Sequence, residues 1–244
     1  MTPEIQFVSL VEGIEETMPI IPVSEQKYDW VKRAGVQTKE RNQGQTVKSR
    51  NTLRCPAIFQ FRNMGFLMRA PFDILIKIKS ETEYEWEHGS PQYEELLKLV
   101  SHHDLELMYN FMNSWPKDTM KIILKLNLPW ALRIPKGYDV LMIDPFYKDD
   151  NRFTVCPGTF ESQLGIGQLN VPVMWHSTKG EFLIKAGTPI AQLVPIKRET
   201  VSHQNLNLTT DKNFRRDSAI TFLKIRESFE RNYNKAREFL KDKI

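Results

Sequence analysis

The stretch from residue 128 to residue 198 constrains the fold more than any other part of this chain. Its apolar runs are short, and proline, glycine, asparagine and aspartate separate them. Apolar runs of about four to eight residues between such turn formers are typical of short β-strands. We therefore predict a mainly β fold, a barrel or a jelly-roll-like sandwich, forming a single domain over residues 1–210.

The segment before this stretch carries further strand patterns. Ile74, Ile76 and Ile78 alternate with other residues, which indicates a strand with one buried face. Residues 55–79 as a whole predict two or three strands, with a turn at Asn63-Met64-Gly65. Additional strands are expected over residues 5–11, 81–87 and 121–126.

Two segments show helical spacing. Leu96, Leu97 and Val100 predict a helical insertion near residues 91–114. Residues 215–243 predict a C-terminal helix, because their apolar positions fall on one stripe. The stripe comprises Ala219, Phe222, Leu223, Phe229, Tyr233, Ala236, Phe239 and Leu240. Such a helix either packs on its own β domain or joins subunits into a homo-oligomer, and the pattern leaves both alternatives open.

Residues 31–54 form a polar, basic segment that we expect to be a long loop. Its cations are Lys32, Arg33, Lys39, Arg41, Lys48, Arg50 and Arg54. One interpretation is an arm that contacts the phosphates of a nucleic acid. A solvated loop is the favoured interpretation, because no aromatic residue interleaves with the charges as a stacking platform requires.

Composition excludes several classes of protein. The net charge of +4 is too mild to demand a nucleic-acid partner. Cys55 and Cys156 are the two cysteines, and without a CxxC pair they predict free thiols rather than a zinc site. The first residues lack a secretory pattern, so we expect a cytoplasmic protein, and no apolar run is long enough for a membrane partner. No metal or other cofactor is predicted.

Residues 128–198 contain few candidates for catalytic or metal-binding side chains. His176 is its one histidine, so no set of metal ligands can be named, and a Cys156–His176 dyad is a minor alternative. Asp144, Asp149 and Asp150 form a carboxylate-rich loop that suits a hard cation or, more simply, a solvated turn. A small-ligand site would use aromatic and polar side chains. The candidates are Trp130, Tyr138, Phe146, Glu161, Asn170, Trp175 and His176.

Two resemblances rest on particular motifs. Cys55-Pro56, Pro129-Trp130 and the segment from Gly187 to Gln192 resemble a family of uncharacterised bacterial and phage proteins, known as a domain of unknown function. The same Gly187–Gln192 segment, followed by Leu193, resembles the strand-turn-strand of the dUTPase and dCTP deaminase superfamily. This second resemblance implies a β fold and a nucleotide ligand.

The catalytic positions of that superfamily are not matched in this chain. Residues 160–170 contain Glu161 but no tyrosine, and Gly167 or Gln168 stands near the place of the deaminase glutamate. The sequence therefore favours a non-enzymatic phage-type accessory or assembly protein. The alternatives are a β domain that binds a nucleotide or another small ligand with altered or lost catalysis, and a protein that binds nucleic acid through residues 31–54.

Overall fold

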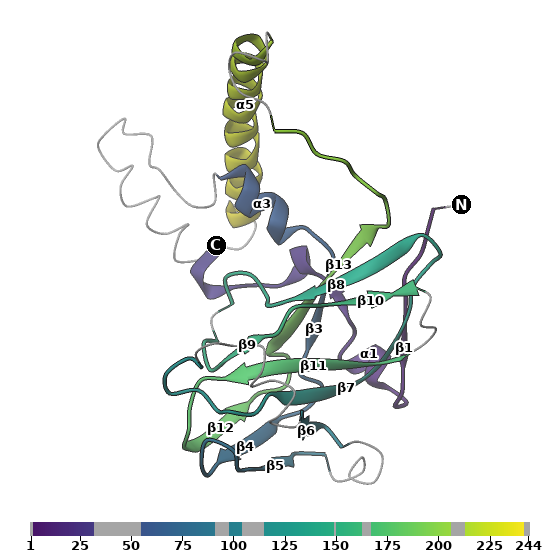
Figure 1. The fold of residues 1–244 in the computed structure, drawn as a ribbon, viewed down its shortest axis with the longest axis vertical. Coiled ribbons are helices and arrows are strands. Elements are labelled where there is room, and N and C mark those ends of the chain that lie inside the picture. The colour runs from purple at the N-terminus through teal and green to yellow at the C-terminus, as the bar shows by residue number, and fades with distance from the viewer. Residues whose placement is uncertain are drawn as a thin grey trace. The chain divides into compact units, whose positions relative to one another are not determined.

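The chain divides into two units in the computed structural model, which describes residues 2–31, 55–90, 98–103, 115–148, 150–162, 167–205 and 213–241. The β unit comprises residues 1–26 and 65–198, and the helical unit comprises residues 27–64 and 199–244. Figure 1 shows the strands of the first unit and the helices α3 and α5 of the second. Within the β unit every strand pairing is antiparallel.

Three sheets build the β unit, so the mainly β prediction is confirmed, as separate sheets rather than one closed barrel. The first sheet contains β1 (Gln6–Ser9), β6 (Val100–His102), β7 (Leu124–Arg133), β9 (Phe153–Val155) and β11 (Gly167–Trp175). The second contains β2 (Ile21–Pro22), β3 (Phe66–Arg69), β8 (Tyr138–Ile143), β10 (Gly158–Glu161) and β13 (Pro189–Lys197). The third contains β4 (Ile74–Ile78), β5 (Tyr84–His88) and β12 (Gly180–Ile184). Helix α1 (Ile14–Thr17) and a 3-10 turn (Val23–Glu25) connect the first strands.

The hydrophobic core follows the alternation that the sequence predicts. Ile74, Ile76 and Ile78 of β4 are buried, as the period of two requires. The pairing of β7 with β11 lies over this core, where β11 buries alternate residues from Leu169 to Trp175 and β7 buries every residue from Leu128 to Leu132. Burial of these apolar side chains is the main favourable contribution to folding.

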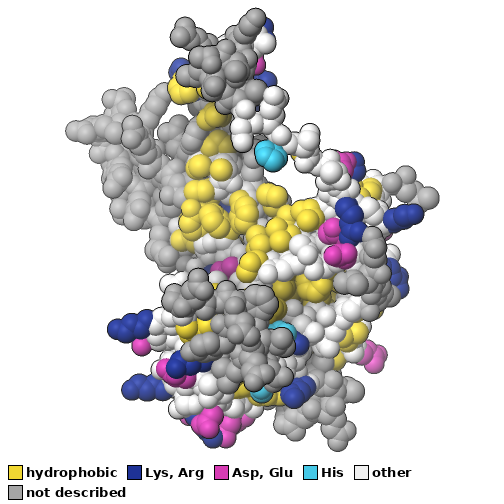
Figure 2. All heavy atoms as spheres, in the orientation of Figure 1, with side chains coloured by type: hydrophobic (Ala, Val, Ile, Leu, Met, Phe, Trp, Pro, Cys, Tyr) yellow, Lys and Arg dark blue, Asp and Glu magenta, His cyan; other side chains and the backbone are white. Residues whose placement is uncertain are grey.

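The third sheet places charged pairs on its outward side. Lys77 of β4 forms an ion pair with Glu87 of β5 at 2.6 Å, and Lys79, which follows β4, forms one with Glu85 of β5. Charged side chains are visible in Figure 2 at the end of the unit where Figure 1 places these two strands. Among the described strands, β5 is the last of its sheet.

Gly65 opens β3 at a point where only a glycine fits. Its φ is +73°, and a Cβ built there would lie 2.0 Å from the carbonyl oxygen of Leu193. Leu193 pairs with Phe66, so the close approach is the start of the β3–β13 pairing. Glycine at position 65 therefore serves both the predicted turn at residues 63–65 and the close packing against Leu193.

One predicted strand is wrong. Residues 56–62 form the helix α3 (Pro56–Arg62), where the apolar run after Cys55 had suggested a strand. Pro56 occupies the first turn of the helix, where its missing N–H costs no hydrogen bond. The run is seven residues long, a length at which strand and helix cannot be separated by periodicity alone.

The predicted insertion near residues 91–114 falls mostly outside the described residues. Its described part differs from the helical expectation, because Val100–His102 forms β6 and pairs with β7. The basic segment also lies outside the description from residue 32 to residue 54, which includes all seven of its named cations.

The predicted C-terminal helix is present as α5 (Phe214–Lys241), which contacts α3 within the helical unit. Phe222 is 68% exposed, and Leu223 and Ile225 are also exposed. Hydrophobic side chains are visible in Figure 2 where Figure 1 draws this helix. Within the described part of the chain, no helix has the length and apolar character needed to cross a membrane.

Candidate functional site

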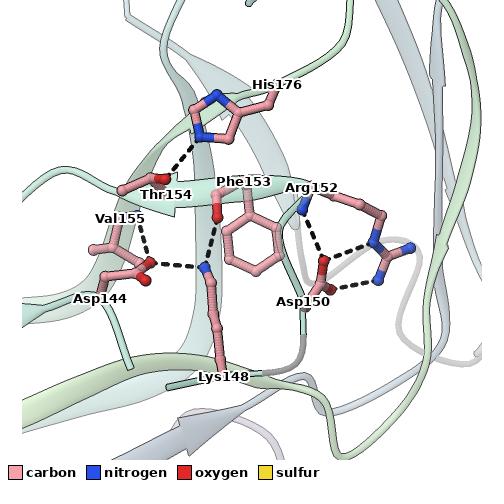
Figure 3. Close-up of polar contacts among 8 residues, drawn as sticks. All are labelled: Asp144, Lys148, Asp150, Arg152, Phe153, Thr154, Val155 and His176. Atoms are coloured by element: carbon pink, nitrogen blue, oxygen red, sulfur yellow. Dashed lines mark hydrogen bonds and ion pairs between the residues drawn. The ribbon is translucent and has the colours of Figure 1, made fainter. Parts of the chain in front are cut away.

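The connection from β8 to β9, residues 144–152, is held at both ends by charged side chains (Figure 3). Asp144 follows β8 directly, and its Oδ1 accepts a hydrogen bond of 2.8 Å from the backbone N–H of Val155 in β9. The same oxygen accepts a hydrogen bond of 2.7 Å from Nζ of Lys148. Asp144 therefore ties the start of the loop to the strand that the loop leads into. We call the described residues of this connection, 144–148 and 150–152, the clasped loop.

Lys148 is the buried cation of the clasped loop, with a side chain that is 7% exposed. Besides Asp144, its ammonium group donates 2.6 Å to the carbonyl oxygen of Phe153 and lies 4.0 Å from the centre of the Phe153 ring. Burial lowers the pKa of Lys148, and the hydrogen bond that Lys148 donates to Asp144 opposes that shift only in part. The ammonium group is thus committed to closing the loop.

A second clasp joins Asp150 to Arg152. Both carboxylate oxygens of Asp150 are used, with Oδ1 accepting from Nε of Arg152 at 2.9 Å and Oδ2 from a terminal nitrogen at 2.6 Å. Burial raises the pKa of Asp150, but the hydrogen bonds from Arg152 outweigh it and leave the pKa below its ordinary value. The other terminal nitrogen of Arg152 donates to the carbonyl oxygen of Leu183 at 2.6 Å, which connects the loop to β12.

His176 follows β11 and lies above the strand that the clasped loop enters (Figure 3). Its Nε2 lies 2.7 Å from the hydroxyl oxygen of Thr154, and its Nδ1 lies 3.1 Å from the hydroxyl oxygen of Thr119. Each ring nitrogen thus faces a threonine hydroxyl, which can donate or accept, and this arrangement suits a neutral imidazole. Burial and the Lys148 charge lower the pKa of His176, which favours this neutral form.

The clasped loop presents two aromatic rings to solvent. Phe146 is 36% exposed and Tyr147 is 42% exposed, with ring centres 3.8 Å apart in an edge-to-face arrangement. The N–H of Lys148 donates to the carbonyl oxygen of Pro145, which closes a tight turn with Tyr147 at its third position. Tyr147 has a φ of +54°, a conformation that costs a residue other than glycine about 1–2 kcal/mol. Backbone strain of this kind is concentrated at functional sites.

Three of the seven predicted ligand residues lie on the clasped loop or contact β9, the strand that the loop enters. Phe146 lies on the clasped loop, His176 lies beside Thr154, and Trp175 stacks on Phe153 with 5.7 Å between ring centres. Trp175 is fully buried, so its ring supports the loop from the core and is not a surface available to a ligand.

The other four predicted residues lie elsewhere in the β unit. Trp130 and Asn170 belong to the paired strands β7 and β11, and Trp130 is buried in the core. Tyr138 begins β8, and Glu161 ends β10, where Arg198 approaches it at 3.4 Å. Arg198 also pairs with Asp139, and this hydrogen bond raises the pKa of Arg198. This second cluster fastens β8, β10 and the end of β13 together.

Neither cysteine nor metal chemistry gains support from the geometry. Burial raises the pKa of the Cys156 thiol, which disfavours the thiolate that a nucleophile needs. His176 directs both ring nitrogens to threonine hydroxyls, so the Cys156–His176 dyad is not formed. Within the described ranges, no group of three His, Cys, Asp or Glu side chains is placed to hold a metal ion.

Sequence reasoning missed the roles of Lys148, Arg152 and Thr154. The Asp144–Lys148 spacing of four residues was a usable signal, because a helix or a tight loop brings such positions together. No sequence signal marked the left-handed backbone of Tyr147, a conformation that favours glycine.

Comparisons with known proteins give a likeness to phage enzymes. No family model matches the chain, and no curated protein matches its sequence. Among solved structures, the dUTPase from phage phi11 of S. aureus is 10% identical, with a TM-score of 0.36 over 84% of this chain and 97% of that chain. The Staphylococcus bacteriophage 80alpha dUTPase with dUpNHpp is 10% identical, with a TM-score of 0.37 over 84% of this chain and 96% of that chain.

Proposed function

We propose that the β unit binds a small planar ligand, which stacks on Phe146 and Tyr147 at the clasped loop. The observation that carries this proposal is an exposed aromatic pair on a turn that keeps Tyr147 at a φ of +54°. Aromatic rings fixed in one orientation are suited to stacking on a flat ligand, because little entropy is lost when the ligand binds.

The surrounding contacts support a preformed site. Two ionic clasps hold the loop, and Phe153 and Trp175 stack beneath it, so the ring pair does not have to be ordered by the ligand. The loop leads into β9, where the Thr154 hydroxyl lies 2.7 Å from Nε2 of His176.

The test is a binding screen with heteroaromatic compounds, comprising free bases, nucleosides and nucleotides, read by thermal shift and by titration calorimetry. We expect at least one compound to raise the melting temperature at millimolar concentration. The double variant Phe146→Ala/Tyr147→Ala should weaken its binding by about tenfold or more, the usual contribution of one stacked base.

Ile196→Ala is the matched control, because Ile196 is a similarly exposed apolar residue on β13, 37% exposed. It should leave both binding and stability unchanged. If no compound binds, or if binding survives loss of both rings, the proposal is wrong.

A second candidate function is self-assembly through α5, which Phe222, Leu223 and Ile225 favour because they are large apolar side chains exposed on one helix. Exposed apolar groups that gather on one element commonly mark a protein interface. The full chain should then have a mass above that of a monomer in light scattering, and Phe222→Glu should reduce it. Thr221→Glu places the same charge at the adjacent exposed position and should have no effect. A monomeric full chain would rule out this function.

A further inference from the structure

Strand β1 has an open backbone edge at one margin of the first sheet (Figure 1). Among the described strands it pairs with β7 alone, and continuing the register places Leu10 opposite Pro129. The N–H of Leu10 donates to the Pro129 carbonyl oxygen at 3.0 Å, so Leu10 and, two residues earlier, Val8 direct their backbone groups toward β7. The backbone N–H and C=O groups of Phe7 and Ser9 therefore point away from β7.

The side chains of β1 suit the addition of another strand. Phe7 faces the core, where its ring meets Phe66 edge to face at 5.2 Å. On the opposite face Val8 is 39% exposed, and Leu10, just beyond the strand, is 47% exposed. The strand itself, Gln6–Ser9, contains no charged residue and no proline. An exposed edge with apolar and uncharged side chains is a place where a further strand can pair.

Other described edges of the β unit are protected. In β9, side chains of the clasped loop accept from the Val155 N–H and donate to the Phe153 carbonyl oxygen. In β12, Arg152 donates to the carbonyl oxygen of Leu183. Strand β5 carries the two Lys–Glu pairs, and β2 is two residues long and ends in a proline. Within the described part of the chain, β1 carries no such cap, charged pair or proline.

We propose that β1 pairs antiparallel with β1 of a second copy of this chain across a two-fold axis. A two-fold interface must match itself, and β1 does so because it carries no charge that would repel its own copy. The exposed Val8 and Leu10 side chains of both copies then lie on one face of the joined sheet. The pair uses up both β1 edges, and the protected edges oppose further growth, so the product is a dimer and not a filament.

Hydrogen exchange of the full chain, followed by NMR, tests this pairing directly. The Phe7 and Ser9 amides should exchange about tenfold or more slowly at high protein concentration than at low concentration, because they are bonded only in the dimer. The Val155 amide is bonded to Asp144 within one molecule, so its exchange rate should not depend on concentration. If Phe7 and Ser9 exchange at one rate up to millimolar protein, the β1 pairing does not form.

Val8→Lys places on β1 the kind of charge that protects β5. The dissociation constant of the dimer should rise about tenfold or more, because an apolar contact is lost from each copy and two lysines approach each other. Leu183→Lys is the matched control, since it makes the same change at a 41% exposed position on β12, and it should leave the association unchanged. Association that survives Val8→Lys would overturn the inference.

Two further variants keep the test decisive. If Val8→Lys unfolds the β unit in a thermal scan, Ser9→Pro replaces it, because proline removes one outward N–H and leaves the hydrogen bonds to β7 in place. Phe222→Glu alters α5 alone and should preserve the concentration dependence of the Phe7 and Ser9 amides. If Phe222→Glu abolishes that dependence, association occurs through α5 and the inference is wrong.

Discussion

Replacing Gly65 by alanine is expected to destabilise the β unit by about 3 kcal/mol or more. The new Cβ would lie 2.0 Å from the Leu193 carbonyl oxygen and 2.9 Å from the Leu193 carbonyl carbon. Both atoms are backbone, so relief requires β3 and β13 to separate where their pairing begins. The left-handed conformation at φ +73° adds its own cost for a residue with a Cβ. Urea unfolding of wild type and variant measures the difference.

Gly137→Ala separates the two contributions. Gly137 also has a positive φ, +83°, but a Cβ there meets nothing within 4 Å. We expect this variant to lose only about 1 kcal/mol, the cost of the conformation alone. Equal losses in the two variants would mean that the approach of Gly65 to Leu193 does not constrain the native state.

Trp175→Ala is expected to cost about 3–5 kcal/mol, the range for deletion of a large buried aromatic side chain. The Trp175 ring is 0% exposed, stacks on Phe153 and meets Phe182 edge to face at 5.5 Å. Its loss leaves a cavity beside Phe153. Because the Lys148 ammonium group of the clasped loop lies over the Phe153 ring, the loop also loses support. Chemical denaturation followed by the remaining tryptophan fluorescence measures the effect.

Trp175→Phe decides whether Trp175 belongs to the core or to the ligand surface, and Leu183→Ala is its control. Trp175→Phe retains most of the buried surface and should bind the ligand as wild type does, with a smaller loss of stability. Leu183→Ala removes an apolar side chain that is 41% exposed and should change stability by less than about 0.5 kcal/mol. Loss of binding in a stable Trp175→Phe protein would show that Trp175 is part of the ligand site.

The mainly β architecture was predictable because it depends on the alternation of apolar residues and on the turn-forming residues between strands. The alternation at Ile74, Ile76 and Ile78 predicted a strand with one buried face, and β4 has that face in the core. The run after Cys55 was not predictable in the same way. Seven residues that begin with a proline satisfy either structure, and the structure forms the helix α3.

The candidate site was predictable only in part, because pairing partners on different strands are set by register. His176 and Phe146 were recognised as candidates by residue type, but Thr154 and Thr119, which contact the two ring nitrogens of His176, lie 22 and 57 residues away from it. The aspartates at 144 and 150 suggested a cation site or a solvated turn. The structure pairs them with Lys148 and Arg152, so side chains of the same loop take the place of a metal ion.

Within the described strands the third sheet ends in β5, whose outward-facing Glu85 and Glu87 are paired with Lys79 and Lys77. The edge strand of a sheet is a template on which a strand of another molecule can add. Any such strand would have to set its own side chains beside a row of charges that are already satisfied. The row of charged pairs therefore opposes edge-to-edge aggregation between molecules. This allows the sheets to remain open, without closing into a barrel, in concentrated solution.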